Sequence, residues 1–201
     1  PESNLTLWGT GNPVPMFDPE FRPGDNLYSN STVAMDADTG EIAWYFQYTP
    51  GDYLDYDEVG SHLLYDVEIN GESRKVLGHF GRNGFYYNLD RNTGAFLNSG
   101  QYLEEVDWVE GIDPKTGKPI GYDSSKLLQE YIPGSAPRRG QPAIEACPHL
   151  QGGVNFWPTA YNPILQIAYG ASFEGCFSVV PSGDQIEDPT SVAPGDIFLG
   201  G

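Results

Sequence analysis

The sequence predicts an all-β protein, and more narrowly part of a β-propeller, from three observations. Two stretches follow one template, VAMDADTGEIAW at residues 33–44 and YNLDRNTGAFLN at residues 87–98. The chain also has 25 Gly and 17 Pro together with 13 Tyr and 10 Phe, a composition typical of turns and aromatic strand residues. Finally, no segment keeps a helical period of apolar residues, so long helices are not expected.

The spacing of the two copies indicates a radial repeat. Asp36 and Asp90, which occupy the same place in the template, are 54 residues apart, near the roughly 40–50 residues of one propeller blade. Two unrelated hairpins would give the same local pattern. The second copy also carries Asn98 where the first has Trp44.

The template itself favours a β-hairpin. Asp36 and Asp38 can cap a tight turn with their carboxylates, and Gly40 tolerates a positive φ. The apolar residues on either side supply the strand faces. We expect Trp44 to pack between neighbouring blades.

The chain has 201 residues, whereas a closed propeller needs at least four blades. Its first residues, PESNLTLWGTGNP, resemble the middle of a strand, and its last, DIFLGG, resemble the approach to another strand. We therefore expect residues 1–201 to be one partial propeller domain, comprising several blades of a longer chain.

The charge of the chain restricts its partners. A formal net charge of −18 argues against nucleic-acid binding, because a phosphate backbone would be repelled. The same charge suits a cationic partner such as a basic electron carrier. No run of about 18 apolar residues is present, so no membrane span is predicted.

The first candidate ligand lies in the loop at residues 9–26, where Gly, Asn and Pro are too dense for regular structure. In the sequence GTGNP, Asn12 places a side-chain amide oxygen at a rigid bend, and such an oxygen is a good ligand for a hard cation. The ordinary alternative is that an Asn before Pro only forms the turn.

An acidic stretch, TPGDYLDYDEVG at residues 49–60, contains the candidate acids. If this stretch is locally extended, Asp55 and Asp57 point the same way. Two carboxylates on one face repel each other unless a cation or a shared proton lies between them, so the pair is a candidate metal or general-base site. A solvated acidic loop is the alternative.

Arg82 stands between glycines in HFGRNGF, next to aromatic strand residues. A guanidinium held there could bind a planar anionic ligand through two parallel hydrogen bonds. The competing interpretation is an ordinary turn with a surface arginine.

The stretch CPHLQGGVNFWPTAYNP at residues 147–163 joins a cysteine, a Gly-Gly bend, Asn155 and large aromatics. Cys147 and Cys176 could form a disulfide or remain two buried thiols, and they do not have the spacing of a zinc site. His149 has no further ligand at metal spacing and is interpreted as structural. His62 and His79 are interpreted as isolated.

Taken in order, these stretches resemble the quinoprotein alcohol dehydrogenases, which depend on pyrroloquinoline quinone (PQQ) and include the methanol dehydrogenase large subunit. The resemblance runs through nearly the whole chain, in LWGTGNPVP, RPGDNLYSNSTVAMDADTGEIAWYFQYTP, RNGFYYNLDRNTG, GIDPKTGKP and CPHLQGGVNFWPTAYNP. It implies that the chain belongs to the middle of an eight-bladed propeller.

The resemblance assigns roles to the residues singled out above. Asn12 is similar to the asparagine that ligates the active-site cation, and Asp55 to the catalytic aspartate, which in the family follows a Trp that is Leu54 here. Arg82 resembles the basic residue that hydrogen-bonds the quinone oxygens, and Asn155 the asparagine that contacts PQQ.

Further implications of the resemblance concern the cysteines, the compartment and the metal. Cys147 and Cys176 resemble the family's second, structural disulfide, which suits an oxidising compartment such as the periplasm.

Asp57, two positions after the catalytic aspartate, resembles an aspartate found at that position in the lanthanide-dependent branch of the family. An extra carboxylate there offsets a trivalent charge, so a lanthanide is favoured over Ca²⁺.

The expected reaction is oxidation of an alcohol to an aldehyde by hydride transfer to metal-bound PQQ. Asp55 would act as general base and also ligate the metal with Asn12 and Asp57, while cytochrome c or a similar carrier would accept the electrons. Two alternatives stay open: a non-catalytic propeller scaffold that binds protein partners, and a quinoprotein that acts on polyols or bulkier alcohols. A homodimer is also left open.

Overall fold

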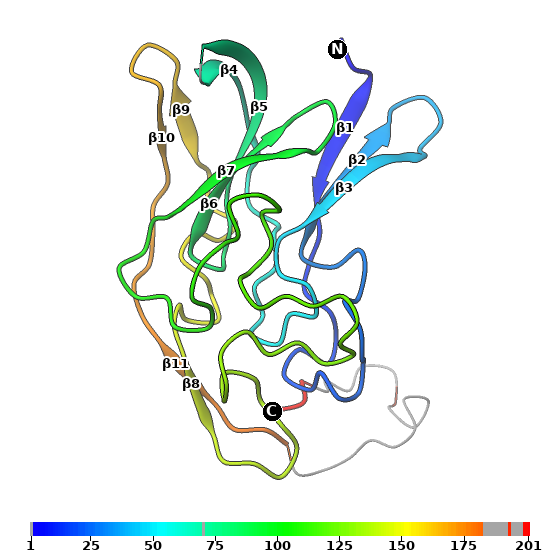
Figure 1. Cartoon of the computed structure of the whole chain (residues 1–201), viewed down its shortest axis with the longest axis vertical. Helices are drawn as coiled ribbons and strands as arrows, with labels where there is room; N and C mark the ends of the chain where they lie inside the picture. The colour runs from blue at the N-terminus through cyan, green and yellow to red at the C-terminus, as the bar shows by residue number, and fades with distance from the viewer. Residues whose placement is uncertain (1, 70, 183–192, 194–198) are drawn as a thin grey trace.

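The chain folds into strands joined by long loops (Figure 1). The computed structural model describes residues 2–69, 71–182, 193 and 199–201, and within these residues it contains no helix. The described residues therefore include no membrane-spanning helix. The prediction of an all-β chain is confirmed.

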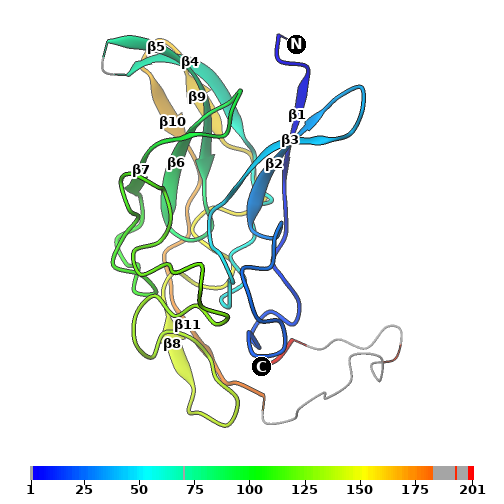
Figure 2. The same ribbon diagram turned by 45° about the vertical axis from the view of Figure 1, so that its right-hand side comes forward.

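The first sheet contains three antiparallel strands in the order β1-β2-β3, which are Leu5–Gly9, Ser31–Asp36 and Ile42–Gln47. The second contains four antiparallel strands in the order β4-β5-β6-β7, which are Leu63–Ile69, Glu72–Phe80, Phe85–Asp90 and Phe96–Gln101. A four-stranded meander of this kind is the unit of a propeller blade. Figure 2 shows the two sheets from the side, one after the other along the chain.

Two further pairs of short strands follow. Strand β8 (Ile144–Ala146) pairs with β11 (Phe177–Val179), and β9 (Ala160–Asn162) pairs with β10 (Ile167–Tyr169). Strand β9 also lies against β4 of the second sheet. The number of blades in the complete ring stays a prediction.

The two copies of the sequence template form equivalent hairpins, β2-β3 and β6-β7. In the first, Asp36 Oδ1 accepts hydrogen bonds from the backbone amides of Asp38 and Thr39 at 3.0 and 2.9 Å. Gly40 has a φ of +74°, as predicted. The carboxylate of Asp38 does not cap this turn as expected, but accepts a hydrogen bond from Asn4 at 2.9 Å.

The second hairpin repeats this arrangement. Asp90 Oδ1 accepts hydrogen bonds from the amides of Asn92 and Thr93, both at 3.0 Å, and Gly94 has a φ of +73°. Asn98, which stands where the first copy has Trp44, pairs across the strands with Asn88, whose amide donates to Asn98 Oδ1 at 2.7 Å.

A third turn of the same kind was missed in the sequence. Asp113 Oδ1 accepts hydrogen bonds from the amides of Lys115 and Thr116 at 2.9 and 2.8 Å, and Gly117 N donates to Asp113 O at 2.9 Å. It lies in GIDPKTGKP, one of the strings that carry the family resemblance. Only one isolated bridge, Ile112 to Pro119, flanks this turn, so no apolar strands marked it as a hairpin.

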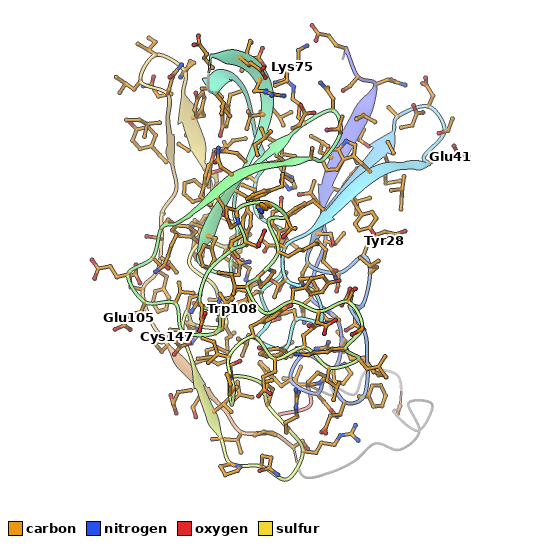
Figure 3. All side chains as sticks on the ribbon, viewed as in Figure 1. Tyr28, Glu41, Lys75, Glu105, Trp108 and Cys147 are labelled. Atoms are coloured by element: carbon orange, nitrogen blue, oxygen red, sulfur yellow. A yellow bond between two sulfur atoms is a disulfide. The ribbon has the colours of Figure 1, made fainter. Side chains whose placement is uncertain are left out.

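The segment that contains this third turn, residues 102–143, has no strands but closes over the core. Trp108 is buried, and its indole N–H donates to Asn83 O at 2.9 Å. Figure 3 shows Trp108 and Cys147 close together among the loops below the sheets. The core joins both sheets to this segment through Trp44, Phe46, Tyr48, Leu77, Tyr87, Leu89, Trp108 and Tyr131.

Trp44 is buried against the neighbouring blade, as predicted. A Cβ atom built on Gly94, in the turn between β6 and β7, would lie only 2.4 Å from Trp44 Cε3. The indole of the first sheet therefore packs on the turn of the second, where only a glycine leaves enough room.

This contact gives a stability prediction with a matched control. Gly94→Ala should lower the free energy of unfolding by about 1–3 kcal/mol more than Gly40→Ala, because it adds a steric clash. Gly40 has nearly the same φ, but a Cβ there meets nothing within 4 Å, so the difference isolates the contact with Trp44. Denaturant unfolding of the full-length protein measures both variants. Equal losses would contradict the packing described here.

Candidate active site

The loops that carry the candidate residues gather at one end of the two sheets. Residues 10–30 follow β1, residues 48–62 join β3 to β4, residues 81–84 join β5 to β6, and residues 147–159 join β8 to β9. Figure 1 shows these connections below the sheets, while the template turns lie at the opposite end. Within each of the two larger sheets, the antiparallel order places the connections on either side of a template turn at the end opposite to that turn.

A buried side-chain carboxylate shapes the loop that carries the two acids. Asp52 accepts hydrogen bonds from the amides of Leu54 and Tyr56, both at 3.0 Å. Asn30 donates to the Asp52 carboxylate at 3.1 Å and to Tyr56 O at 2.7 Å. The loop folds around Asp52, and between the two held amides Asp55 adopts a φ of +65°.

The condition under which Asp55 and Asp57 would point the same way, a locally extended stretch, is therefore not met. A left-handed residue at position 55 reverses the backbone locally, so the alternation of an extended strand does not apply. The acids nevertheless converge: Arg82 Nη1 lies 2.6 Å from Asp57 Oδ1, and Arg82 Nη2 lies 3.6 Å from Asp55 Oδ2. The guanidinium, rather than strand alternation, brings the two carboxylates together.

Arg82 is not a surface arginine, because its side chain is 8% exposed. It also donates a hydrogen bond to Leu150 O, in the loop that follows β8. That loop lies directly on it: a Cβ on Gly152 would lie 2.4 Å from Arg82 Cβ, and Gly153 N donates to Arg82 O at 3.1 Å. The Gly-Gly bend seen in the sequence thus serves to cover Arg82.

Burial shifts the pKa of Asp55, one of the two acids beside Arg82. It raises the pKa of Asp55 to about 7, Arg82 opposes this rise, and the negative charges of Asp57 and Asp52 add to it. One guanidinium faces two carboxylates, so the site holds surplus negative charge when both acids are ionised. A hard cation with oxygen ligands would neutralise that surplus, and the donor set therefore fits such a metal.

The loop that carries Asn12 lies against the acids. Glu58 N donates to Thr10 O at 3.0 Å, and a Cβ on Gly11 would lie 4.0 Å from Asp57 Oδ2. Asn12 is the next residue, and its amide donates to Pro13 O at 3.1 Å. The structure thus places Gly11, the residue before Asn12, beside Asp57, and the role of Asn12 as a metal ligand stays a prediction.

Arg22 fastens this loop to the acidic loop. Its guanidinium donates to Pro15 O at 2.7 Å, Met16 O at 2.8 Å and Asp52 O at 2.6 Å. A fourth hydrogen bond, at 2.7 Å, goes to Asn26 Oδ1. A planar donor group with a fixed geometry can hold several carbonyls at once, and a lysine could not replace it.

Asn155 lies in the loop that covers Arg82, with its side chain engaged locally. Its amide donates to Gln151 O at 2.8 Å, and its carbonyl accepts from Phe156 N at 2.8 Å. Its backbone O lies 3.2 Å from where a Cβ of Gly60 would be, so this loop also touches the end of the acidic loop. A contact between Asn155 and PQQ stays a prediction.

The interpretation of His62 and His79 as isolated was wrong. His79 Nε2 lies 2.8 Å from Glu58 Oε2, and the two imidazole rings pack with their centroids 4.8 Å apart. The partners are 21 residues apart, so spacing along the sequence did not reveal them. A signal was present, because a histidine inside the apolar strand VLGHF must find a polar partner if it is buried.

The surroundings favour the neutral forms of the Glu58–His79 pair. Burial raises the pKa of Glu58 well above its usual value. Burial also lowers the pKa of His79 to about 4, against a smaller opposing effect of the Ser61 backbone. His149, by contrast, packs between Phe173 and Phe177, in agreement with a structural role.

The structure contains a disulfide between Cys147 and Cys176, as the resemblance implied, and the alternative of two free thiols is excluded. The bond links the residue after β8 to the residue before β11, whose ends pair at Ala146 and Phe177. Glu105, labelled at the edge of the molecule in Figure 3, lies 3.4 Å from Cys176 Sγ. Glu105, Cys147 and Cys176 lie close enough together to suggest a metal site. They do not form one, because both sulfurs are in the disulfide and a metal needs a free thiolate.

Comparison with known proteins identifies the family of the chain. Residues 1–99 match the model of the β-propeller domain of glucose, ethanol and alcohol dehydrogenases that use PQQ. The chain is 38% identical over 174 residues to the quinoprotein alcohol dehydrogenase PedH of Pseudomonas putida, covering 87% of this chain and 28% of PedH. It is 36% identical to the dehydrogenase XoxF of Paracoccus denitrificans, covering 90% of this chain and 30% of XoxF.

Solved structures give the same result. The quinohemoprotein alcohol dehydrogenase of Comamonas testosteroni matches with a TM-score of 0.77 and 34% identity, over 90% of this chain and 25% of that one. A europium-containing methanol dehydrogenase matches with a TM-score of 0.73 and 28% identity, over 94% of this chain and 34% of that one. The chain spans less than a third of the length of PedH and of XoxF.

The fold and the comparisons together place the chain in a β-propeller of the dehydrogenase class. The chain belongs to the quinoprotein alcohol dehydrogenase family.

The ion pairs of Arg82 give a second stability prediction. Arg82→Met should lower the free energy of unfolding of the metal-free protein by about 3–5 kcal/mol, because two carboxylates then face each other in a buried site. Arg91→Met is the control, since its partner Asp66 is 61% exposed, and it should cost about 0–1 kcal/mol. Chemical denaturation measures both. Similar losses would show that the Arg82 ion pairs are not specially stabilising.

Proposed function

We propose that the complete protein oxidises an alcohol to an aldehyde, with PQQ bound beside a metal ion and Asp55 as general base. The observation that carries this proposal is the convergence of Asp55 and Asp57 from one loop with Arg82 from another, in one largely buried group. The names of the relatives support the reaction class. A scaffold has no need of this buried charged group, so the interpretation as a non-catalytic scaffold is disfavoured.

The proposed roles follow from the geometry of the chain's own residues. Asp55 has the environment of a base: burial raises its pKa to about 7, near the value at which proton transfer is efficient. It would take the proton from the alcohol hydroxyl at a carboxylate oxygen. Arg82, fixed by Asp57 and Leu150 O, would hold an anionic oxygen of the bound ligand.

When bound, PQQ supplies the hydride acceptor, and the metal supplies Lewis acidity. Arg82 and Asn155 would hold the quinone, while Asn12, Asp55 and Asp57 would hold the metal. The 147–159 loop, which covers Arg82 through its two glycines, would keep water from this side of the site.

We propose a lanthanide as the metal, with Ca²⁺ as the alternative. Asp57 provides the second carboxylate, and its side chain is 18% exposed, so it does not extend into solvent. An additional anionic ligand favours a trivalent over a divalent ion. The europium-containing methanol dehydrogenase among the similar structures supports this choice.

The proposed partners are a small alcohol and an electron carrier such as cytochrome c. A net charge of −18 would attract a basic carrier and speed the encounter at low salt. A periplasmic location is supported by the Cys147–Cys176 disulfide, since disulfides persist in oxidising compartments. A polyol or a bulkier alcohol is the alternative substrate, and a homodimer stays a prediction.

Replacing the proposed base tests the mechanism. Asp55→Asn in the full-length enzyme should lower kcat by about 10²–10⁴-fold, because the amide cannot take the hydroxyl proton. PQQ should still bind, as seen by its absorbance in the near ultraviolet. Dye-linked alcohol oxidation gives kcat, with Asp66→Asn as a surface control. Nearly normal turnover by Asp55→Asn would refute the assignment of the base.

The choice of metal is tested at Asp57. Asp57→Asn should weaken lanthanide binding by about tenfold more than it weakens Ca²⁺ binding, because a neutral amide offsets less of the higher charge. Competition titrations on the full-length apoprotein measure both affinities. If both fell equally, or if the wild type bound Ca²⁺ more tightly, the preference for a lanthanide would be wrong.

A further inference from the structure

Behind the Arg82 ion pairs lies a buried polar pair that the proposed reaction does not use. Glu58 and His79 are 0% and 1% exposed, and their side chains lie 2.8 Å apart. Burying a carboxyl group and an imidazole is costly unless they make good hydrogen bonds. The pair therefore needs an explanation in terms of what it holds in place.

Glu58 contacts two other loops that carry candidate residues, the one with Asn12 and the one with Arg82. Its Oε2 accepts a hydrogen bond from the Arg82 backbone N at 3.3 Å, and its own N donates to Thr10 O at 3.0 Å. Its carbonyl O lies so close to Gly9 that a Cβ there would be 1.9 Å away. Since Asp57 is the preceding residue, the position of Glu58 also fixes the position of that acid.

His79 is itself held rigidly. It lies on β5, paired with Tyr87 on β6, and its ring packs against Tyr48 and His62 with centroids 5.1 and 4.8 Å apart. His62 in turn hydrogen-bonds Thr32 Oγ1 at 2.8 Å. A side chain on a central strand, with its ring packed against two other rings, is a firm support for a loop residue.

We propose that Glu58 and His79 are positioning residues for Arg82. His79, fixed on β5, holds the carboxyl group of Glu58, and Glu58 holds the backbone of Arg82. The guanidinium is then presented to Asp55 and Asp57 at the distances described above. The consequence for catalysis rests on the proposed function, whereas the positioning itself does not.

Four variants of the full-length protein separate this role from simple packing. Glu58→Met keeps the length of the side chain but removes its hydrogen bonds, and Glu58→Gln restores an acceptor for Arg82 N and a polar group for His79. His79→Phe keeps the ring but removes its nitrogens. His62→Phe is the matched control, because it makes the same change in the adjacent ring, which does not touch Glu58.

The first measurement is hydrogen exchange of the Arg82 amide, whose acceptor is Glu58. Glu58→Met and His79→Phe should increase its exchange rate by about tenfold or more, because the amide loses its fixed acceptor. Glu58→Gln and His62→Phe should leave the rate near that of the wild type. This readout needs neither PQQ nor an alcohol, so it decides the inference even if the wild type oxidises no alcohol.

The second measurement is the division of the effect between kcat and KM in the PQQ-loaded enzyme. Glu58→Met and His79→Phe should lower kcat by about 10–100-fold, because a small displacement of Arg82 is costly. KM for the alcohol and the PQQ absorbance should change little, and Glu58→Gln should restore most of kcat. A wild type without turnover would refute the proposed function alone.

Three results would overturn the inference. One is an Arg82 amide that exchanges at the wild-type rate in Glu58→Met or His79→Phe. Another is an equal effect of His62→Phe and His79→Phe, which would indicate ring packing alone. The third is a Glu58→Gln variant that fails to restore the exchange rate. If Glu58→Met does not fold, the comparison of His79→Phe with His62→Phe still decides the matter.

Discussion

The burial of one guanidinium against two carboxylates is the constraint on which this end of the molecule depends. Arg82 joins Asp57 and Asp55 from one loop to Leu150 from another. A buried charge is stable only when it is paired and hydrogen-bonded, so the three segments must keep their relative positions. Loops without regular structure thereby acquire the precision that a binding site needs.

The support for this group comes from polar side chains that satisfy backbone groups. Asp52 holds the loop in which Asp55 takes its left-handed conformation. Arg22 holds that loop against the one that carries Asn12. Irregular backbone has no sheet partners for its amides and carbonyls, so buried side chains must supply them. The acidic loop is thus an ordered part of the core rather than a solvated surface.

Much of the fold could be predicted from local chemistry. The Asp, Thr and Gly of the template specify the turns at Asp36 and Asp90, and Trp44 packs between the sheets as expected. The turn at Asp113 was missed because apolar strands do not flank it. The partners of His79 were missed because Glu58 is distant in sequence. The backbone conformation of Asp55 could not be predicted, because the buried Asp52 carboxylate shapes the loop around it.

The sequence by itself determined the strands, the turns and the residue types of the site, because alternation, turn chemistry and charge act between residues near one another in the chain. Only the tertiary structure decided that Arg82 is buried between two acids, that Glu58 meets His79 and that Cys147 is bonded to Cys176. These contacts join residues between 21 and 29 positions apart. Their geometry is set by how the sheets pack and where the chain returns, which no local pattern encodes.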